Sequence, residues 1–226
     1  MPVRLRSTCA LAIVLLPALA TVLLLGGCHS ADDWSGPRAA PTPIGTLGPG
    51  FVDPSAPPSP EATITPNPGS WDGVHPSKGY RVVLLTAGDD PQTKTLATAV
   101  REWATAEKVS LKTVDAAGDY VARIADAINL KPDLIISAGN PLVDPLSLVT
   151  ASHLDQQFLV IGAELAEPTT NVTAATWPGA SYRGEGLGTS TAYDPASFTQ
   201  PRAAAALRAG VAGVLSGHTG IVVWLH

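Results

Sequence analysis

Short apolar segments alternate with amphipathic segments along the last two thirds of the chain, and this alternation constrains the fold more than any other feature. The segments with the length and the apolar or β-branched content of strands are 80–86, 109–114, 133–138, 157–161, 171–177 and 220–225. The segments predicted to be helices are 92–108, 118–129, 141–153 and 201–216. Strands and helices in alternation predict an α/β fold with a doubly wound, mainly parallel sheet and right-handed crossovers.

Two of these segments carry the clearest patterns. Residues 118–129 place apolar side chains at i, i+3, i+4 and i+7, which is typical of a helix with one buried face. Residues 133–138 are continuously apolar after the first position, as in a strand that is buried on both faces. The chain from residue 78 to residue 226 is long enough to bury one core. We expect a flavodoxin-like strand order, 2-1-3-4-5, and leave open whether 220–225 joins the sheet.

The N-terminus has the layout of a secretory signal. Two cations, Arg4 and Arg6, precede an apolar stretch over 9–25, and the small pair Gly26–Gly27 follows. An uncleaved membrane helix is the alternative, because the apolar stretch is nearly long enough to span a bilayer. Pro17 in its middle weakens that alternative, although membrane helices tolerate proline.

Leu25-Gly26-Gly27-Cys28 resembles the lipobox of bacterial lipoproteins, in which the cysteine receives a diacylglycerol and becomes the new N-terminus. The resemblance implies that residues 1–27 are a signal peptide and that Cys28 is lipidated. The acyl chains would hold the protein on the extracytoplasmic face of the cell membrane. Cys9 would leave with the signal, so that no free thiol would remain for thiolate catalysis.

The next segment, 28–77, contains 11 Pro and 6 Gly and shows neither helical nor strand periodicity. This composition predicts a disordered, Pro-rich tether, which could reach roughly 150 Å if it were fully extended. Its isolated aromatic residues, Trp34, Phe51 and Trp71, are interpreted as incidental. The sequence therefore predicts three parts: the signal peptide, the tether, and an α/β domain over 78–226.

The net charge of −5 and the absence of a basic run exclude a nucleic-acid partner. After Cys28 the chain has twelve Lys and Arg residues against nineteen Asp and Glu residues, so we expect the lipid and not electrostatic adhesion to anchor the protein. The histidines lack the i, i+4 spacing of a helical metal pair, and no metal or cofactor is expected. No GxSxG turn and no other catalytic arrangement is present, so we do not expect an enzyme.

Ligands of open parallel sheets bind at the carboxyl ends of the strands. The polar residues that follow the predicted strands, and that we predict to contact a small ligand, are Thr86, Asp89, Ser137, Asn140 and Glu164. Helix capping is the competing interpretation, favoured for Asp90 and Asn140 and evenly balanced for Asp89 and Ser137. Trp177 either stacks on a ligand or packs on the last helix, and packing is favoured.

Three segments carry a wider resemblance: PDLIISAG (132–139), HLDQQFLVIG (153–162) and NVTAATWPGASYRGEGLG (171–188). They resemble the first lobe of type I periplasmic binding proteins and, more narrowly, the basic-membrane-protein (BMP) lipoproteins that bind nucleosides for import. The resemblance implies non-catalytic recognition of a small molecule, such as a nucleoside, or of an envelope protein. A second lobe has no counterpart in this sequence. A cell-envelope scaffold without a ligand and an envelope enzyme are the alternatives, and the oligomeric state is left open.

Overall fold

The structure is a computed structural model, and it describes residues 33–165, 168–180 and 192–226. The predicted signal peptide and the lipidation site at Cys28 lie outside the described residues. Within the described ranges, no helix is both long and apolar enough to cross a bilayer.

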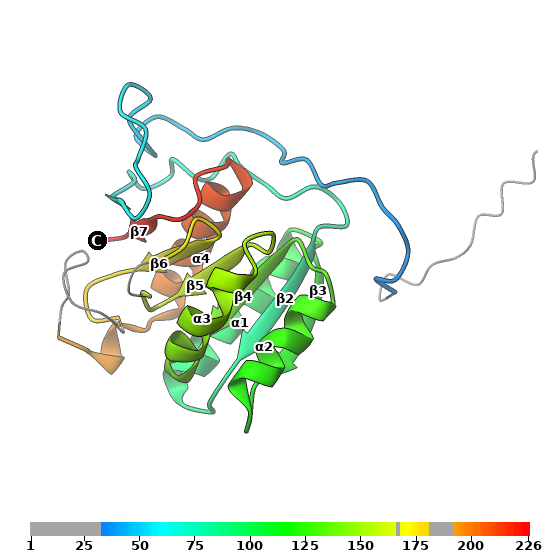
Figure 1. The fold of residues 1–226 in the computed structure, drawn as a ribbon. Coiled ribbons are helices and arrows are strands. Elements are labelled where there is room, and N and C mark those ends of the chain that lie inside the picture. The colour runs from blue at the N-terminus through cyan, green and yellow to red at the C-terminus, as the bar shows by residue number, and fades with distance from the viewer. Residues whose placement is uncertain (1–32, 166–167, 181–191) are drawn as a thin grey trace, which may run out of the picture.

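Seven parallel strands form one sheet in the order β1-β7-β6-β5-β4-β2-β3 (Figure 1). The strands are β1 (Thr63–Ile64), β2 (Arg81–Thr86), β3 (Ser110–Asp115), β4 (Leu134–Ala138), β5 (Phe158–Ile161), β6 (Val172–Thr176) and β7 (Val222–Trp224). From β2 onward the order is the predicted flavodoxin-like one, so the α/β fold class is confirmed. The last predicted strand joins the sheet as β7, and β1 extends it by one more strand.

Helices cover both faces of the sheet. The main helices are α1 (Pro91–Ala106), α2 (Tyr120–Asn129), α3 (Val143–Val149) and α4 (Gln200–Leu215), and the short 3₁₀ helices are η1 (Asn140–Leu142), η2 (Thr150–Ser152) and η3 (Pro195–Ser197). One buried cluster joins the sheet to α1 and α4, and a second joins it to α2 and α3. Figure 1 shows α2 and α3 in front of the sheet and α1 and α4 behind it.

The crossover through α4 differs from the expectation of uniform right-handed connections. The steps from β3 to β4, from β4 to β5 and from β6 to β7 all run the same way across the sheet. Crossovers of one hand would therefore place α2, α3 and α4 on one face. Instead α4 packs with α1 on the opposite face, so the connection from β6 to β7 has the opposite hand. The apolar surface of α1 explains this position, because Leu96 and Val100 lie in the cluster that α4 completes.

The segment predicted to be a disordered tether is instead folded over its described part, residues 33–77. Phe51 is 2% exposed, Trp71 is 5% exposed and Trp34 is 8% exposed, so the aromatic residues interpreted as incidental are buried. Three aromatic side chains together bury enough apolar surface to hold a chain that has no periodicity of its own. The prediction of disorder was wrong for these residues.

Backbone pairing completes the docking of this segment. Strand β1 pairs with β7, where the Glu61 N–H donates to the Gly220 carbonyl at 2.8 Å. Ile44 and His75 form an antiparallel bridge that pairs two distant parts of this segment with each other. Figure 1 shows the segment running along one edge of the sheet to β7 and returning to β2. The segment therefore covers the sheet at the ends where the strands begin, and leaves the carboxyl ends open.

Candidate functional site

A cavity of about 290 Å³ lies at the carboxyl ends of β2, β4 and β5. We call it the carboxyl-end cleft. The residues that line it are Asp90, Gln92, Thr93, Leu96, Ser137, Gly139, Asn140, Pro141, Val160, Ile161, Gly162, Ala163, Tyr193 and Phe198. Parallel strands bring the loops that follow them to one edge, so this position is the one the fold predicts for a ligand.

Ser137 is the buried polar group of the cleft. It is the fourth residue of β4, opposite Val160 of β5, and its side chain is almost fully buried. Its hydroxyl oxygen has no hydrogen-bond partner among the described residues. A buried hydroxyl without a hydrogen-bond partner destabilises the fold. A water or a ligand atom in the cleft would supply the missing hydrogen bond.

Asp90 lines the cleft and caps helix α1. Its carboxylate accepts a hydrogen bond of 2.8 Å from the Thr93 N–H and one of 2.7 Å from the Thr93 hydroxyl. Partial burial raises the pKa of Asp90, but these hydrogen bonds outweigh it and hold the pKa below its usual value. The capping interpretation of Asp90 is confirmed, and the residue presents a negative charge beside the cleft.

Asn140 does not cap a helix, so the interpretation favoured from the sequence was wrong. The residue begins η1, and the preceding Gly139 occupies the cap position without any side-chain capping bond. Gly139 has φ +127°, and a Cβ there would lie 2.3 Å from the Ala87 carbonyl oxygen. This close approach of β4 to the end of β2 requires glycine. It leaves the exposed amide of Asn140 at the cleft.

Two aromatic side chains form one wall of the cleft. The ring of Phe198 packs edge-on against Trp177, with centroids 5.1 Å apart, and the centroid of the Tyr193 ring lies 6.0 Å from that of Phe198. Burial raises the pKa of Tyr193, and the negative charge of Asp90 raises it further. Trp177 itself is buried and donates to the Ser197 hydroxyl at 3.0 Å, so the packing interpretation is confirmed.

The structure brings together only part of the predicted ligand site. Ser137 and Asn140 line the cleft, whereas Thr86, Asp89 and Glu164 are not among its lining residues. Thr86 is half-buried at the end of β2, and Asp89 is exposed. Glu164 is 2% exposed, and burial raises its pKa to about 7.

Tyr193 and Phe198 were missed by sequence reasoning. They follow β5 by some thirty residues and precede α4, so no strand-end signal marks them. The only available hint was their aromatic character in a polar stretch, and their position depends on the docking of α4 beside α1.

The charges of the cleft limit its chemistry. None of the described lining residues is Lys, Arg or His, and Asp90 is the one acid among them. The described part of the chain also contains no cluster of His, Cys, Asp and Glu that could hold a metal ion. Hydroxyl, amide and carboxylate groups beside aromatic rings suit a polar molecule that is uncharged or cationic, since an anion would find no counter-charge here.

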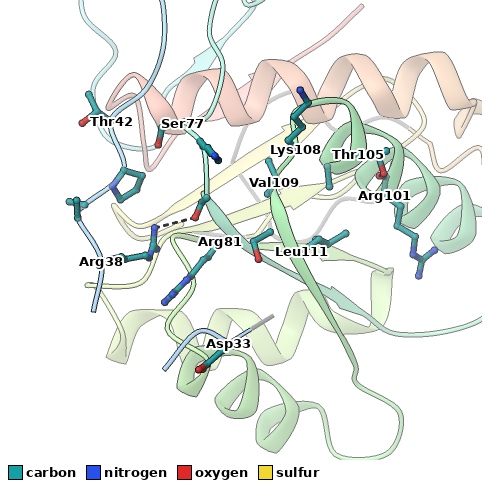
Figure 2. A pocket seen from close by; sticks show the side chains of 17 residues that line it. Asp33, Arg38, Thr42, Ser77, Arg81, Arg101, Thr105, Lys108, Val109 and Leu111 are labelled. Carbon is teal, nitrogen blue, oxygen red and sulfur yellow. Dashed lines mark hydrogen bonds between the residues drawn. The ribbon is translucent and has the colours of Figure 1, made fainter. Parts of the chain in front are cut away.

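A second, larger cavity of about 1060 Å³ lies at the opposite edge of the sheet (Figure 2). It lies between residues 33–42 and the region where α1 ends and β3 begins. None of the predicted ligand-binding residues lines this cavity.

No family model matches this chain, and no curated protein matches it either. Among solved structures, it is similar to an ABC transporter solute-binding protein from Aeropyrum pernix K1 at 20% identity, over 44% of this chain and 29% of that one (TM-score 0.38). A fragment from Peptoclostridium difficile 630, provisionally described as a lipoprotein, matches at 16% identity over 60% of this chain and 98% of that one (TM-score 0.43). A Bacillus halodurans C-125 solute-binding protein with bound myo-inositol matches at 17% identity, over 41% and 39% of the two chains (TM-score 0.30).

The chain spans about a third of the length of the first solute-binding proteins it matches. The resemblance to the BMP lipoproteins stays a prediction.

Proposed function

We propose that this protein is a membrane-anchored, extracytoplasmic lipoprotein that binds a small polar molecule in the carboxyl-end cleft without transforming it. The observation that carries the proposal is the unpaired hydroxyl of Ser137, buried in a cleft that Asn140 and Asp90 also line. A fold retains such a group most readily where a bound molecule supplies the missing hydrogen bond.

The aromatic wall supports a ligand with a ring or a flat apolar face. Tyr193 and Phe198 line the same cleft as Ser137 and Asn140 and present aromatic rings there. An uncharged nucleoside or sugar combines a face for stacking with hydroxyl groups for Asn140 and Ser137. A cavity of about 290 Å³ is at the small end of the range for ligand pockets, which favours a single sugar or nucleoside unit.

The hydrogen bonds of Asp90, the charged residue of the cleft, support binding without catalysis. Both oxygens of the Asp90 carboxylate accept hydrogen bonds from Thr93, and the lowered pKa makes this carboxylate a weak base. Ser137 has no histidine or other base among the described residues that line the cleft, so nothing there would activate its hydroxyl as a nucleophile.

A melting experiment tests ligand binding. The chain from residue 28 onward is heated with nucleosides, neutral sugars and amino acids, each in excess. A ligand at about 100 times its Kd stabilises the protein by about 2.7 kcal/mol, and this raises Tm by roughly 5–10 °C. Ser137→Ala should keep the fold and roughly halve this shift, because one hydrogen bond to the ligand contributes about 1 kcal/mol. The matched control Ser147→Ala, at an exposed serine of α3, should keep the full shift.

If no compound of these classes moves the midpoint, small-molecule binding is refuted. A shift that is undiminished in both Ser137→Ala and Asn140→Ala would place the ligand elsewhere.

Membrane anchoring is tested separately in cells. Native protein should incorporate labelled palmitate and fractionate with membranes, and Cys28→Ala should lose both properties. Membrane retention of Cys28→Ala would instead support an uncleaved N-terminal helix.

A further inference from the structure

The larger cavity, at the edge of the sheet where the strands begin, has a concentrated positive charge. We call it the basic groove. Its charged lining residues are Arg38, Lys78, Arg81, Arg101, Lys108 and Asp33. Figure 2 shows Arg38 on the N-terminal segment, Arg81 on β2, and Arg101 and Lys108 in the α1–β3 region, all of which line this cavity.

The charge of this groove is opposite to that of the whole chain. The residues that line the groove include five of the twelve Lys and Arg residues that follow Cys28, but only one of the nineteen Asp and Glu residues. The net negative charge of the polypeptide therefore conceals a local excess of cations at one edge of the sheet. Such segregation favours an anionic partner at this edge.

Among the described residues, two of the groove's cations have partners and the other three have none. Arg38 pairs with Asp133, while Arg81 donates to the Trp34 carbonyl at 2.8 Å and lies over the Trp34 ring. Lys78, Arg101 and Lys108 are exposed. Among the described residues, no ion pair or hydrogen bond engages the side chains of these three.

Two acids of this region, Glu107 and Asp33, are already engaged. Glu107 precedes Lys108 in the chain, and its carboxylate lies 3.1 Å from His75. Asp33 accepts hydrogen bonds from the backbone and the hydroxyl of Ser35. Lys78, Arg101 and Lys108 therefore remain available to an external anion.

The groove also has apolar lining, which includes Ala104, Val109 and Leu111. A free phosphate would use the cations and leave these side chains in water. A phospholipid headgroup with its glycerol ester region offers an anion and an apolar surface together, and this combination matches the groove better.

The short stretch of chain between Cys28 and Asp33 would hold this groove near the membrane. Asp33 is the fifth residue after Cys28, so their Cα atoms lie at most about 18 Å apart. A lipid on Cys28 would therefore keep one wall of the groove close to the headgroups. The carboxyl-end cleft lies at the opposite edge of the sheet, where it would face away from the bilayer and stay open to solutes.

We propose that the basic groove docks on anionic phospholipid headgroups of the membrane that holds the Cys28 anchor, and so fixes the orientation of the domain. This inference rests on the proposed lipidation for its geometry and adds a second contact with the membrane. A diacyl anchor holds a protein at the membrane but does not fix how its domain is turned, and a nearby set of basic side chains on one surface adds an attraction that favours one orientation.

Vesicle binding by unlipidated protein tests the groove by itself. The chain from residue 28 onward with Cys28→Ser is mixed with vesicles of phosphatidylcholine alone or with about 30 mol% phosphatidylglycerol, at about 0.1 M salt. We expect binding to the anionic vesicles only. Each cation near an anionic surface strengthens binding about fivefold, so Lys78→Gln/Arg101→Gln/Lys108→Gln should weaken it at least tenfold.

The matched control is Lys94→Gln/Arg123→Gln/Arg202→Gln, which removes the same charge from the first halves of α1, α2 and α4, at the other edge of the sheet. This control should bind anionic vesicles within about twofold of the parent chain. Equal loss in both triple variants would show a general charge effect and overturn the proposal.

Two other outcomes also overturn it. One is equal binding to neutral and anionic vesicles. The other is binding of soluble glycerol phosphate or inorganic phosphate without binding to anionic vesicles, which would make the groove a small-anion site. The protein in this assay carries no lipid and no cleft ligand, so failure of either part of the proposed function leaves these results unchanged.

Discussion

Truncation of Phe51 to alanine is the sharpest test of how the N-terminal segment is held. The side chain is 2% exposed and belongs to the main buried cluster of the domain. Its ring packs against α4 at Gly213, where an added Cβ would lie 3.5 Å from the ring, and its centroid is 6.2 Å from that of His218. Phe51 therefore joins the segment to the last helix.

The expected cost of Phe51→Ala follows from this burial. A buried aromatic side chain removes about 150–250 Å² from water, and at about 25 cal/mol per Å² the loss is of order 4 kcal/mol. Phe→Ala substitutions in cores cost about 3–5 kcal/mol. A change of about 4 kcal/mol lowers Tm by roughly 8–16 °C in a chain of this size.

Urea unfolding of the chain from residue 28 onward, followed by tryptophan fluorescence, measures the effect. Ile44→Ala is the control, because this side chain lies in the same segment and is 55% exposed. It should change the free energy of unfolding by about 0.5 kcal/mol or less. Limited proteolysis should also cut the 33–77 segment faster in Phe51→Ala than in the control. A destabilisation within 1 kcal/mol of the control would refute the docking and restore the interpretation of this segment as a free tether.

Three further substitutions test the cleft and its surroundings. Asp90→Ala should cost about 1 kcal/mol at pH 7 by urea unfolding. Because the folded pKa of Asp90 is lowered, its contribution is present above its usual pKa of 3.8 and should vanish as pH falls through the folded value; a pH-independent difference would contradict this. Glu164→Gln should stabilise the protein above pH 7 by on the order of 1–2 kcal/mol. The reason is that burial raises the pKa of this carboxyl from 4.5 to about 7, so the free energy of unfolding of the wild type falls as pH rises through this range. Equal stability of the wild type at pH 5 and pH 8 would argue against it. Gly139→Ala should cost about 3 kcal/mol or more in thermal unfolding, because its Cβ would lie 2.3 Å from the Ala87 carbonyl, and a near-native Tm would contradict this geometry.

The strands and helices of the sheet region were predictable because their signals are local. The apolar run of β4 and the one-sided periodicity of α2 come from neighbouring residues, and their bounds differ from the predicted ones by only one or two residues. The strand order from β2 onward is the flavodoxin-like order that was expected for this alternation of strands and helices. Part of the cleft was predictable for the same reason, since Ser137 and Asn140 lie at or just after the end of β4.

The remaining features depend on contacts between distant parts of the chain. The burial of Phe51 requires α4, which lies about 150 residues later, and the aromatic wall requires Tyr193 and Phe198 to reach β5. The basic groove likewise gathers side chains from the N-terminal segment, β2 and α1. Composition describes the average of a segment, and periodicity describes only near neighbours. A Pro-rich segment with a few aromatic residues has the composition of a disordered chain until a complementary apolar surface from another part of the protein buries them.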